Sequence, residues 1–234
     1  MPYPLFYEEN LPDNGSFPLS EETSRHIIQV LRMKNGQPLQ LTNGKGQTNI
    51  TEIVRENKKT AEVKIISTSN VANPVPQISI AISLIKNKNR FEWFLEKATE
   101  IGVQHIIPMM CERTEKEHFR LERMHNILIS AMLQSKQAWL PRLTEPVKYS
   151  DLVKGSSQPN RFIAYCNEEE KNQLRDLITI RGDRIILIGP EGDFTKAEIE
   201  LAIENNFIPV TLGETRLRTE TAGIVSCVML NQVF

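Results

Sequence analysis

The hydrophobic pattern of the chain changes at a polar segment, residues 67–77, that contains Pro74 and Pro76. Before this segment, apolar residues fall in short runs separated by turn signals. After it, apolar runs of strand length alternate with stretches of helical periodicity, which is typical of a mainly parallel sheet. The pattern therefore predicts two domains, residues 1–72 and residues 73–234.

Residues 1–72 have the pattern of a small, mostly β domain, and we expect a barrel. Ser20 is a natural N-cap for one helix, whose apolar stripe would be Ile27, Val30 and Leu31. Asn/Gly and Asn/Lys turns separate three apolar runs that are predicted to be strands: 38–41, 48–54 and 60–66.

Residues 73–234 are predicted to form an α/β domain. Gly102 is placed to end one helix, and Thr195 with Glu198 forms a capping box that begins another. The predicted strands are 78–85, 105–110, 161–166, 184–188 and 207–212. The predicted helices are 91–101, 117–137, 195–205 and 221–234.

Composition excludes several classes of protein. Lys and Arg number 28 and Asp and Glu number 29, so a net charge of −1 excludes a strongly basic nucleic-acid coat protein. The three cysteines, Cys111, Cys166 and Cys227, have no metal-ligand spacing, so we expect reduced thiols and no metal. The start of the chain does not resemble a signal peptide, and apolar runs of 18 residues are missing, so we expect a cytoplasmic protein that does not cross a membrane.

Three polar or glycine-bearing stretches follow predicted strands, at 165–168, 189–194 and 212–218. Ligands of parallel α/β sheets bind at the carboxyl ends of the strands, so these stretches are a candidate site. Gly189 and Gly192 are expected to give positive φ and close approach of the backbone to a ligand. A plain turn followed by a capped helix is the alternative.

The absence of two phosphate-binding sequence motifs restricts the kind of ligand that the candidate site can bind. Neither a dinucleotide GxGxxG after a strand nor a GxxxxGK[ST] phosphate loop is found. The loops therefore suit a nucleoside without phosphates, and S-adenosylmethionine is one such ligand.

The stretch from Lys86 to Arg142 contains ten Lys and Arg residues and seven Glu residues. Phe91, Trp93 and Trp139 lie in the same stretch. Cations and aromatic rings in this mixture are found on RNA-binding surfaces. A solvated face of two amphipathic helices explains the same pattern, and composition favours it.

Several motifs in chain order resemble the RsmE family of 16S rRNA uridine N3-methyltransferases, which is of the SPOUT class. The motifs cover nearly the whole chain: HIIQVLRMKNGQPLQLTNGKG (26–46), EKATEIGV (96–103), PMMCERT (108–114), LIGPEGDF (187–194) and LGETRLRTETA (212–222). The chain departs from the family at 133–137, where many members have Glu-Gln-Cys-Gly-Arg, and at Thr215, where many have Arg.

The resemblance implies a parallel-sheet methyltransferase domain with a C-terminal trefoil knot, preceded by a PUA-like barrel that binds RNA. It also implies a homodimer, S-adenosyl-L-methionine as cofactor, and a uridine in the decoding region of 16S rRNA in the small ribosomal subunit as substrate.

For such a methyltransferase we expect roles for particular residues of this chain. Arg218 would stabilise charge on the base, with Arg216 as the alternative, and Glu191 would orient the base or the cofactor amine, with Glu220 as its rival. The expected cofactor-binding residues are Tyr165, Asn167, Gly189, Pro190, Glu191, Gly192, Leu212, Gly213, Leu217 and Thr221. The expected RNA-binding residues are Arg32, Lys34, Arg113, Gln134 and Lys136.

Two other functions compete with this one. A ribosome-binding module without catalysis would use the barrel and the basic region, and its three loops would be plain turns. An α/β enzyme that acts on a small nucleotide is disfavoured by the missing phosphate loop.

Overall fold

The computed structural model describes residues 3–115, 119–166, 172–178 and 181–231. They fold into two compact units. The first unit lies within residues 1–73 and also takes in 132–140, and the second lies within 74–131 and 141–234. The sequence pattern placed 132–140 in the second domain, so this segment departs from the predicted division.

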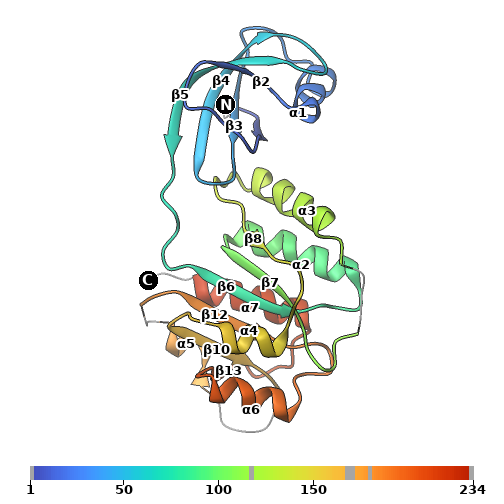
Figure 1. The fold of residues 1–234 in the computed structure, drawn as a ribbon, viewed down its shortest axis with the longest axis vertical. Helices are drawn as coiled ribbons and strands as arrows, with labels where there is room; N and C mark the ends of the chain where they lie inside the picture. The colour runs from blue at the N-terminus through green and yellow to red at the C-terminus, as the bar shows by residue number, and fades with distance from the viewer. Residues whose placement is uncertain (1–2, 116–118, 167–171, 179–180, 232–234) are drawn as a thin grey trace. The chain divides into compact units, whose positions relative to one another are not determined.

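A curled sheet of five strands forms the first unit, in the order β1-β3-β4-β5-β2. Figure 1 labels four of these strands, β2 to β5. β1 pairs in parallel with β3, and the other neighbours are antiparallel. Leu39, Leu41 and Ile53 are fully buried in the core beneath the sheet, as alternation along strands requires. The strands are β1 (Leu5–Tyr7), β2 (Ser16–Pro18), β3 (Pro38–Thr42), β4 (Gln47–Arg55) and β5 (Glu62–Asn70).

The predicted helix of the first unit is short and changes its winding. Ser20 caps α1 (Glu21–Arg25) by accepting a hydrogen bond from Thr23 N, as predicted. The chain then continues as a π-helical turn, η1 (His26–Val30), in which Leu31 N donates to His26 O. The wider turn breaks the predicted stripe, because Ile27 is buried whereas Val30 and Leu31 are exposed.

β5 is longer than the predicted strand and takes in part of the predicted linker. Residues 67–70 pair with 50–47 of β4, although the polar sequence of this segment favoured a linker. Ladder hydrogen bonds come from the backbone, so polar side chains on an accessible sheet face are compatible with the strand.

Segment 132–140 joins the first unit through the turn between β3 and β4. Gly46 N donates to Ala138 O, and Leu140 N donates to Gly44 O, so the segment extends the turn as a short ladder. The Trp139 indole N–H donates to Val71 O at 3.1 Å, and a Cβ on Gly46 would lie 2.6 Å from the Trp139 ring. Gly46 is thus required by this close contact.

The second unit contains a parallel sheet in the order β11-β13-β10-β12-β6-β7-β8, and β9 also pairs with β7. Figure 1 labels six of these strands, from β13 to β8. Its two central strands, β6 and β12, are buried at every residue, which explains their unbroken apolar runs. The strands are β6 (Ile78–Ser83), β7 (His105–Met110), β8 (Arg142–Leu143), β9 (Val147–Lys148), β10 (Asn160–Ala164), β11 (Asn172–Gln173), β12 (Arg184–Ile188) and β13 (Ile208–Thr211).

Helices cover both faces of this sheet. On one face, Tyr149 of α4 and Ala202 of α6 share a core with Ile185. On the other face α2 and α7 pack together, and a Cβ on Gly223 of α7 would lie 2.6 Å from the Phe94 ring of α2. The helices are α2 (Lys88–Ile101), α3 (Leu121–Gln134), α4 (Tyr149–Gly155), α5 (Leu174–Leu177), α6 (Lys196–Glu204) and α7 (Thr219–Asn231), and residues 132–134 at the end of α3 belong to the first unit.

The predicted helix ends are confirmed at two places. Gly102 ends α2 in the left-handed conformation, and Thr195 with Glu198 forms both hydrogen bonds of the capping box of α6. The sequence reading missed α4, α5 and the two-residue strands, which are too short to show a period. The C-terminal trefoil knot implied by the resemblance stays a prediction.

Candidate functional site

A pocket of about 610 Å³ lies at the carboxyl ends of three neighbouring strands, β13, β10 and β12. Described residues from each of the three predicted loops line it, since parallel neighbouring strands bring the loops that follow them to one edge of the sheet. Nine residues with predicted site roles line it: Tyr165, Gly189, Pro190, Glu191, Leu212, Gly213, Arg216, Leu217 and Arg218.

Two of the predicted cofactor-binding residues do not line this pocket, and a third belongs to a part of the chain that the structure does not describe. Gly192 and Thr221 are not among its lining residues, and Asn167 lies outside the described residues. The pocket is also lined by residues that were not named individually as predicted site residues: Arg90, Ala164, Cys166, Ile188, Asp193, Val210, Thr211, Glu214, Thr215, Thr219 and Ala222. Arg90 comes from the start of α2, far from the three loops in sequence. A prediction based on the loops that follow strands therefore could not include it.

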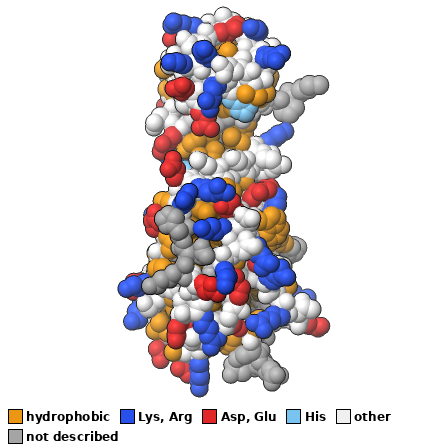
Figure 2. All heavy atoms as spheres, turned by 90° about the vertical axis from the view of Figure 1, so that its right-hand side faces the viewer, with side chains coloured by type: hydrophobic (Ala, Val, Ile, Leu, Met, Phe, Trp, Pro, Cys, Tyr) orange, Lys and Arg blue, Asp and Glu red, His pale blue; other side chains and the backbone are white. Residues whose placement is uncertain are grey.

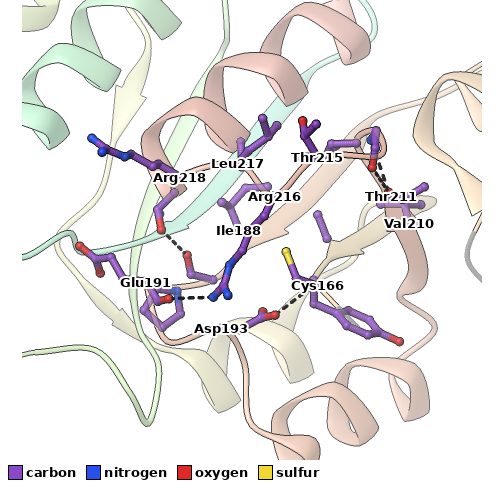
Figure 3. Close-up of a pocket in the computed structure, with 18 of the residues that line it drawn as sticks. Cys166, Ile188, Glu191, Asp193, Val210, Thr211, Thr215, Arg216, Leu217 and Arg218 are labelled. Carbon is purple, nitrogen blue, oxygen red and sulfur yellow. Dashed lines mark hydrogen bonds between the residues drawn. The ribbon is translucent and has the colours of Figure 1, made fainter. Parts of the chain in front are cut away.

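The loop after β12 differs from the prediction in its backbone. Positive φ occurs at Asp193 (62°), and neither Gly189 nor Gly192 has it. The Asp193 carboxylate accepts hydrogen bonds from Phe194 N and Cys166 N, both at 2.8 Å, and so joins the first loop to the second (Figure 3). These bonds favour an aspartate in a conformation that most side chains avoid.

The two glycines of this loop serve close packing. A Cβ on Gly189 would lie 3.1 Å from the buried Phe194 ring, so the glycine lets the ring pack against the loop. A Cβ on Gly192 would lie 3.3 Å from Arg113 Cδ, and Arg113 Nη1 donates to Gly192 O at 2.6 Å. The side of Gly192 on which a Cβ would stand therefore faces Arg113, and its cofactor-binding role stays a prediction.

The third loop carries two exposed arginines into the pocket. Arg216 Nη2 reaches Glu191 O at 3.4 Å, whereas the Arg218 side chain extends away from Arg216 (Figure 3). At the start of α7, Thr219 Oγ1 donates to Gly189 O at 3.0 Å in a buried hydrogen bond. This bond fixes the position of the second loop relative to α7.

The three cysteines differ in environment. Cys166 is exposed and lines the pocket, whereas Cys111 and Cys227 are buried. Burial raises the pKa of the Cys111 thiol to about 12, with the Glu198 carboxylate adding to the shift, and burial also raises the pKa of Cys227. Cys166 is therefore the described thiol that a reagent in solution can reach.

Four of the five predicted RNA-binding residues lie in the first unit. Arg32, Lys34, Gln134 and Lys136 are all exposed. Lys34 forms an ion pair with Glu56 at 3.3 Å. The fifth residue, Arg113, belongs to the second unit and holds Gly192 as described above.

Several cations of the 86–142 stretch have acidic partners. Lys86 pairs with Glu115 at 3.0 Å, and Arg123 pairs with Glu92 at 2.7 Å. Figure 2 likewise shows basic and acidic side chains interspersed over the face that it draws. These pairs favour a solvated helix face for this stretch, as composition suggested.

Metal-binding clusters and membrane-spanning helices are both absent from the described residues. Within them, groups of three or more His, Cys, Asp or Glu side chains suited to a metal ion are absent. A search of the same residues finds that none of their helices has the length and apolar character that crossing a bilayer requires.

Comparison with known proteins identifies both parts of the chain. The family described as "RNA methyltransferase domain" matches residues 71–231, and that described as "RNA methyltransferase PUA domain" matches residues 19–66. The ribosomal RNA small subunit methyltransferase E of Rickettsia conorii is 27% identical over 228 residues, which cover 95% of this chain and 92% of that protein.

Solved structures agree with these matches. A protein from Porphyromonas gingivalis is 37% identical with a TM-score of 0.90, covering 96% of this chain and 95% of that one. Ribosomal RNA small subunit methyltransferase E from Neisseria gonorrhoeae, solved bound to S-adenosyl methionine, is 29% identical with a TM-score of 0.86, covering 96% and 95%. The chain thus belongs to the ribosomal RNA small subunit methyltransferase E family, the RsmE family of the sequence resemblance.

Proposed function

We propose that this methyltransferase modifies N3 of a uridine in the decoding region of 16S rRNA, within the small ribosomal subunit. Its family membership establishes the coarser activity, methylation of small-subunit rRNA with S-adenosyl-L-methionine as the methyl donor. The observation that carries the finer proposal is the pair of exposed guanidinium groups, Arg216 and Arg218, in the pocket. Cations suit a base that becomes negative when N3 loses its proton.

The pocket fits the cofactor by its size and chemistry. A volume of about 610 Å³ is ordinary for a cofactor site, and Ile188, Val210 and Leu212 offer apolar surface to an aromatic base. Gly213 has a φ of 145° and open space where a Cβ would stand, so its backbone groups are accessible to a ligand. The backbone around Gly189, Leu212 and Leu217 would hold the remaining polar groups.

The cofactor, when bound, supplies an electrophilic methyl carbon, so the protein must align uracil N3 with it and favour loss of the N3 proton. Orientation alone contributes much of such a rate enhancement. Arg218 would stabilise the charge on the base, and Arg216 is the second candidate. Glu191 would orient the base or the cofactor amine from the second loop.

We further propose a role for each domain and a location in the cell. Residues 1–72 would bind RNA, with Arg32 in contact with a phosphate, and residues 73–234 would catalyse methyl transfer. The protein would act in the cytoplasm, where small subunits are available.

α7 supports a homodimer, because Val228 is 42% exposed and its neighbours Ile224, Val225 and Met229 are only partly buried. Light scattering at micromolar concentration that gives a monomer would contradict the dimer.

Cofactor binding has a predicted thermal signature. S-adenosylmethionine at a hundred times its Kd should stabilise the protein by about 2.7 kcal/mol, which raises the Tm by roughly 5–10 °C in a chain of this size. NAD and ATP should leave the Tm unchanged. The same cofactor should slow alkylation of Cys166 by about 100-fold, since free protein alone reacts, while Cys111 and Cys227 stay unlabelled in the native fold.

A matched control for this binding test is denatured protein, in which all three thiols should react at the same rate with or without cofactor. A pure RNA-binding module predicts neither the shift in Tm nor the protection. The absence of both effects would therefore favour that alternative.

Methylation of 16S rRNA tests the proposal directly. Small subunits from cells that lack the protein should accept one methyl group from the purified enzyme, and mass spectrometry of rRNA fragments should place it on N3 of a decoding-region uridine. A methyl group on another base, or on the ribose, would contradict the proposed substrate while leaving the family activity intact.

A further inference from the structure

Arg90 brings a third guanidinium group to the pocket from outside the three loops. It lies in the first turn of α2, three residues after Asn87, whose side chain caps the helix by accepting from Asn89 N. Its side chain is 40% exposed and lines the pocket together with Arg216 and Arg218. Arg90 is therefore accessible to a ligand while its backbone is fixed by a capped helix.

A buried carboxylate holds the Arg90 side chain in place. Glu220 lies in the first turn of α7, its side chain is 8% exposed, and its Oε1 lies 3.6 Å from Arg90 Nε. A buried carboxylate requires a cationic partner, so this pair restrains both side chains. A guanidinium carries five N–H donors, and pairing at Nε leaves the donors on Nη1 and Nη2 for a second acceptor.

The elements that carry this pair are themselves held close together. Gly223, one turn after Glu220, packs against the buried Phe94 ring of α2. Thr219, next to Glu220, donates to Gly189 O in the second loop. These two contacts fix the start of α7, and with it Glu220, relative to α2 and to the second loop of the pocket.

The chemistry of uracil gives this third cation a task. N3 stands between two carbonyl groups, so the negative charge left by the N3 proton spreads onto O2 and O4. One donor on each side of N3 would stabilise both oxygens and align the nitrogen. Arg216 Nη2 is directed at Glu191 O, so we take Arg90 and Arg218 as the two guanidinium groups for the base, with Arg216 as the alternative to Arg218.

We propose that Arg90 is a further catalytic residue, which donates to one carbonyl oxygen of the target uracil while Arg218 donates to the other. Glu220 is a positioning residue that orients Arg90. This inference rests on the proposed function, because it assumes a base with two carbonyl groups beside the methylated nitrogen.

A double substitution separates substrate contact from simple charge pairing. Arg90→Ala leaves Glu220 buried without its cation, so its Tm is expected to fall. Arg90→Ala combined with Glu220→Gln removes that unpaired charge, so Tm and cofactor affinity should return close to wild-type values. Single-turnover methyl transfer to small subunits should stay about 10²–10³-fold below wild type in the double variant, as for the loss of one well-placed donor.

Recovery of methyl transfer in the double variant would overturn the proposal, because Arg90 would then serve only to neutralise Glu220. Should both variants fail to fold, Arg90→Lys decides. It keeps the charge for Glu220 and loses the planar fork, so it should keep its Tm and lose most methyl transfer. Wild-type transfer by Arg90→Lys would equally overturn the proposal.

Arg123→Ala is the matched control. Arg123 also pairs with a glutamate, through two hydrogen bonds to Glu92, but it is not among the residues that line the pocket. Its loss should leave methyl transfer unchanged. If wild type and Arg123→Ala both fail to methylate small subunits, the proposed function fails; if they methylate and the double variant does too, only the role of Arg90 fails.

Discussion

Arg218→Ala is expected to reduce single-turnover methyl transfer to small ribosomal subunits by about 10²–10³-fold, the usual effect of losing one well-placed donor. The guanidinium lies exposed in the pocket, between the last strand and α7. Charge on the base appears only as N3 loses its proton, so the contact strengthens toward the transition state. The loss should therefore fall on kcat and leave cofactor affinity and Tm unchanged.

Two comparisons make this result interpretable. Arg32→Ala should weaken binding of the small subunit and make it less dependent on salt, because a phosphate contact acts through counterion release. A structural role for Arg218 predicts instead that Tm and cofactor affinity fall together in Arg218→Ala. Full activity in Arg218→Ala would remove this residue from the mechanism and move the role to Arg216.

Gly223→Ala is expected to destabilise the fold by about 1–3 kcal/mol, the usual effect of overpacking a core. The new Cβ would lie 2.6 Å from Phe94 Cε2 and 3.0 Å from Ile82 Cδ1, and both side chains are fully buried. Either α7 or the Phe94 ring must therefore move. Thermal unfolding should show a Tm lower by roughly 2–12 °C.

The sign of this effect is diagnostic, because Gly→Ala inside a helix ordinarily stabilises by up to about 1 kcal/mol. Gly155→Ala, at the end of α4, is the matched control, since a Cβ there has open space within 4 Å. It should leave the Tm unchanged or raise it. If Gly223→Ala and Gly155→Ala had the same Tm, α2 and α7 would pack less tightly than the short Cβ distances at Gly223 indicate.

The periodicity of the sequence predicted the parallel sheet, the buried runs of β6 and β12, and the helix caps at Gly102 and Thr195. These features depend on local residue types and on burial, which a pattern of apolar residues reports. The position of the pocket followed from topology, because the ends of parallel strands share an edge. Family resemblance added the cofactor and the class of substrate.

The features that the sequence did not reveal depend on contacts between distant segments. Arg90 reaches the pocket because α2 packs on α7, and the apolar pattern of α2 says nothing of its partner. The positive φ of Asp193 depends on its bond to Cys166 N, a residue of another loop. The π-helical turn at 26–30 likewise has no period that differs from an α-helix over so few residues.

The joining of segment 132–140 to the first unit has a consequence for synthesis on the ribosome. The chain passes between the units after residues 73, 131 and 140, so the first unit is incomplete until residue 140 has been made. Translation proceeds at about 5–20 residues per second. The turn at Gly44 and Gly46 is therefore made several seconds before Trp139 and Leu140, which contact it in the folded protein. By then α2 and β7 have already been synthesised, so the order in which the units become complete is not the order in which their first residues are translated.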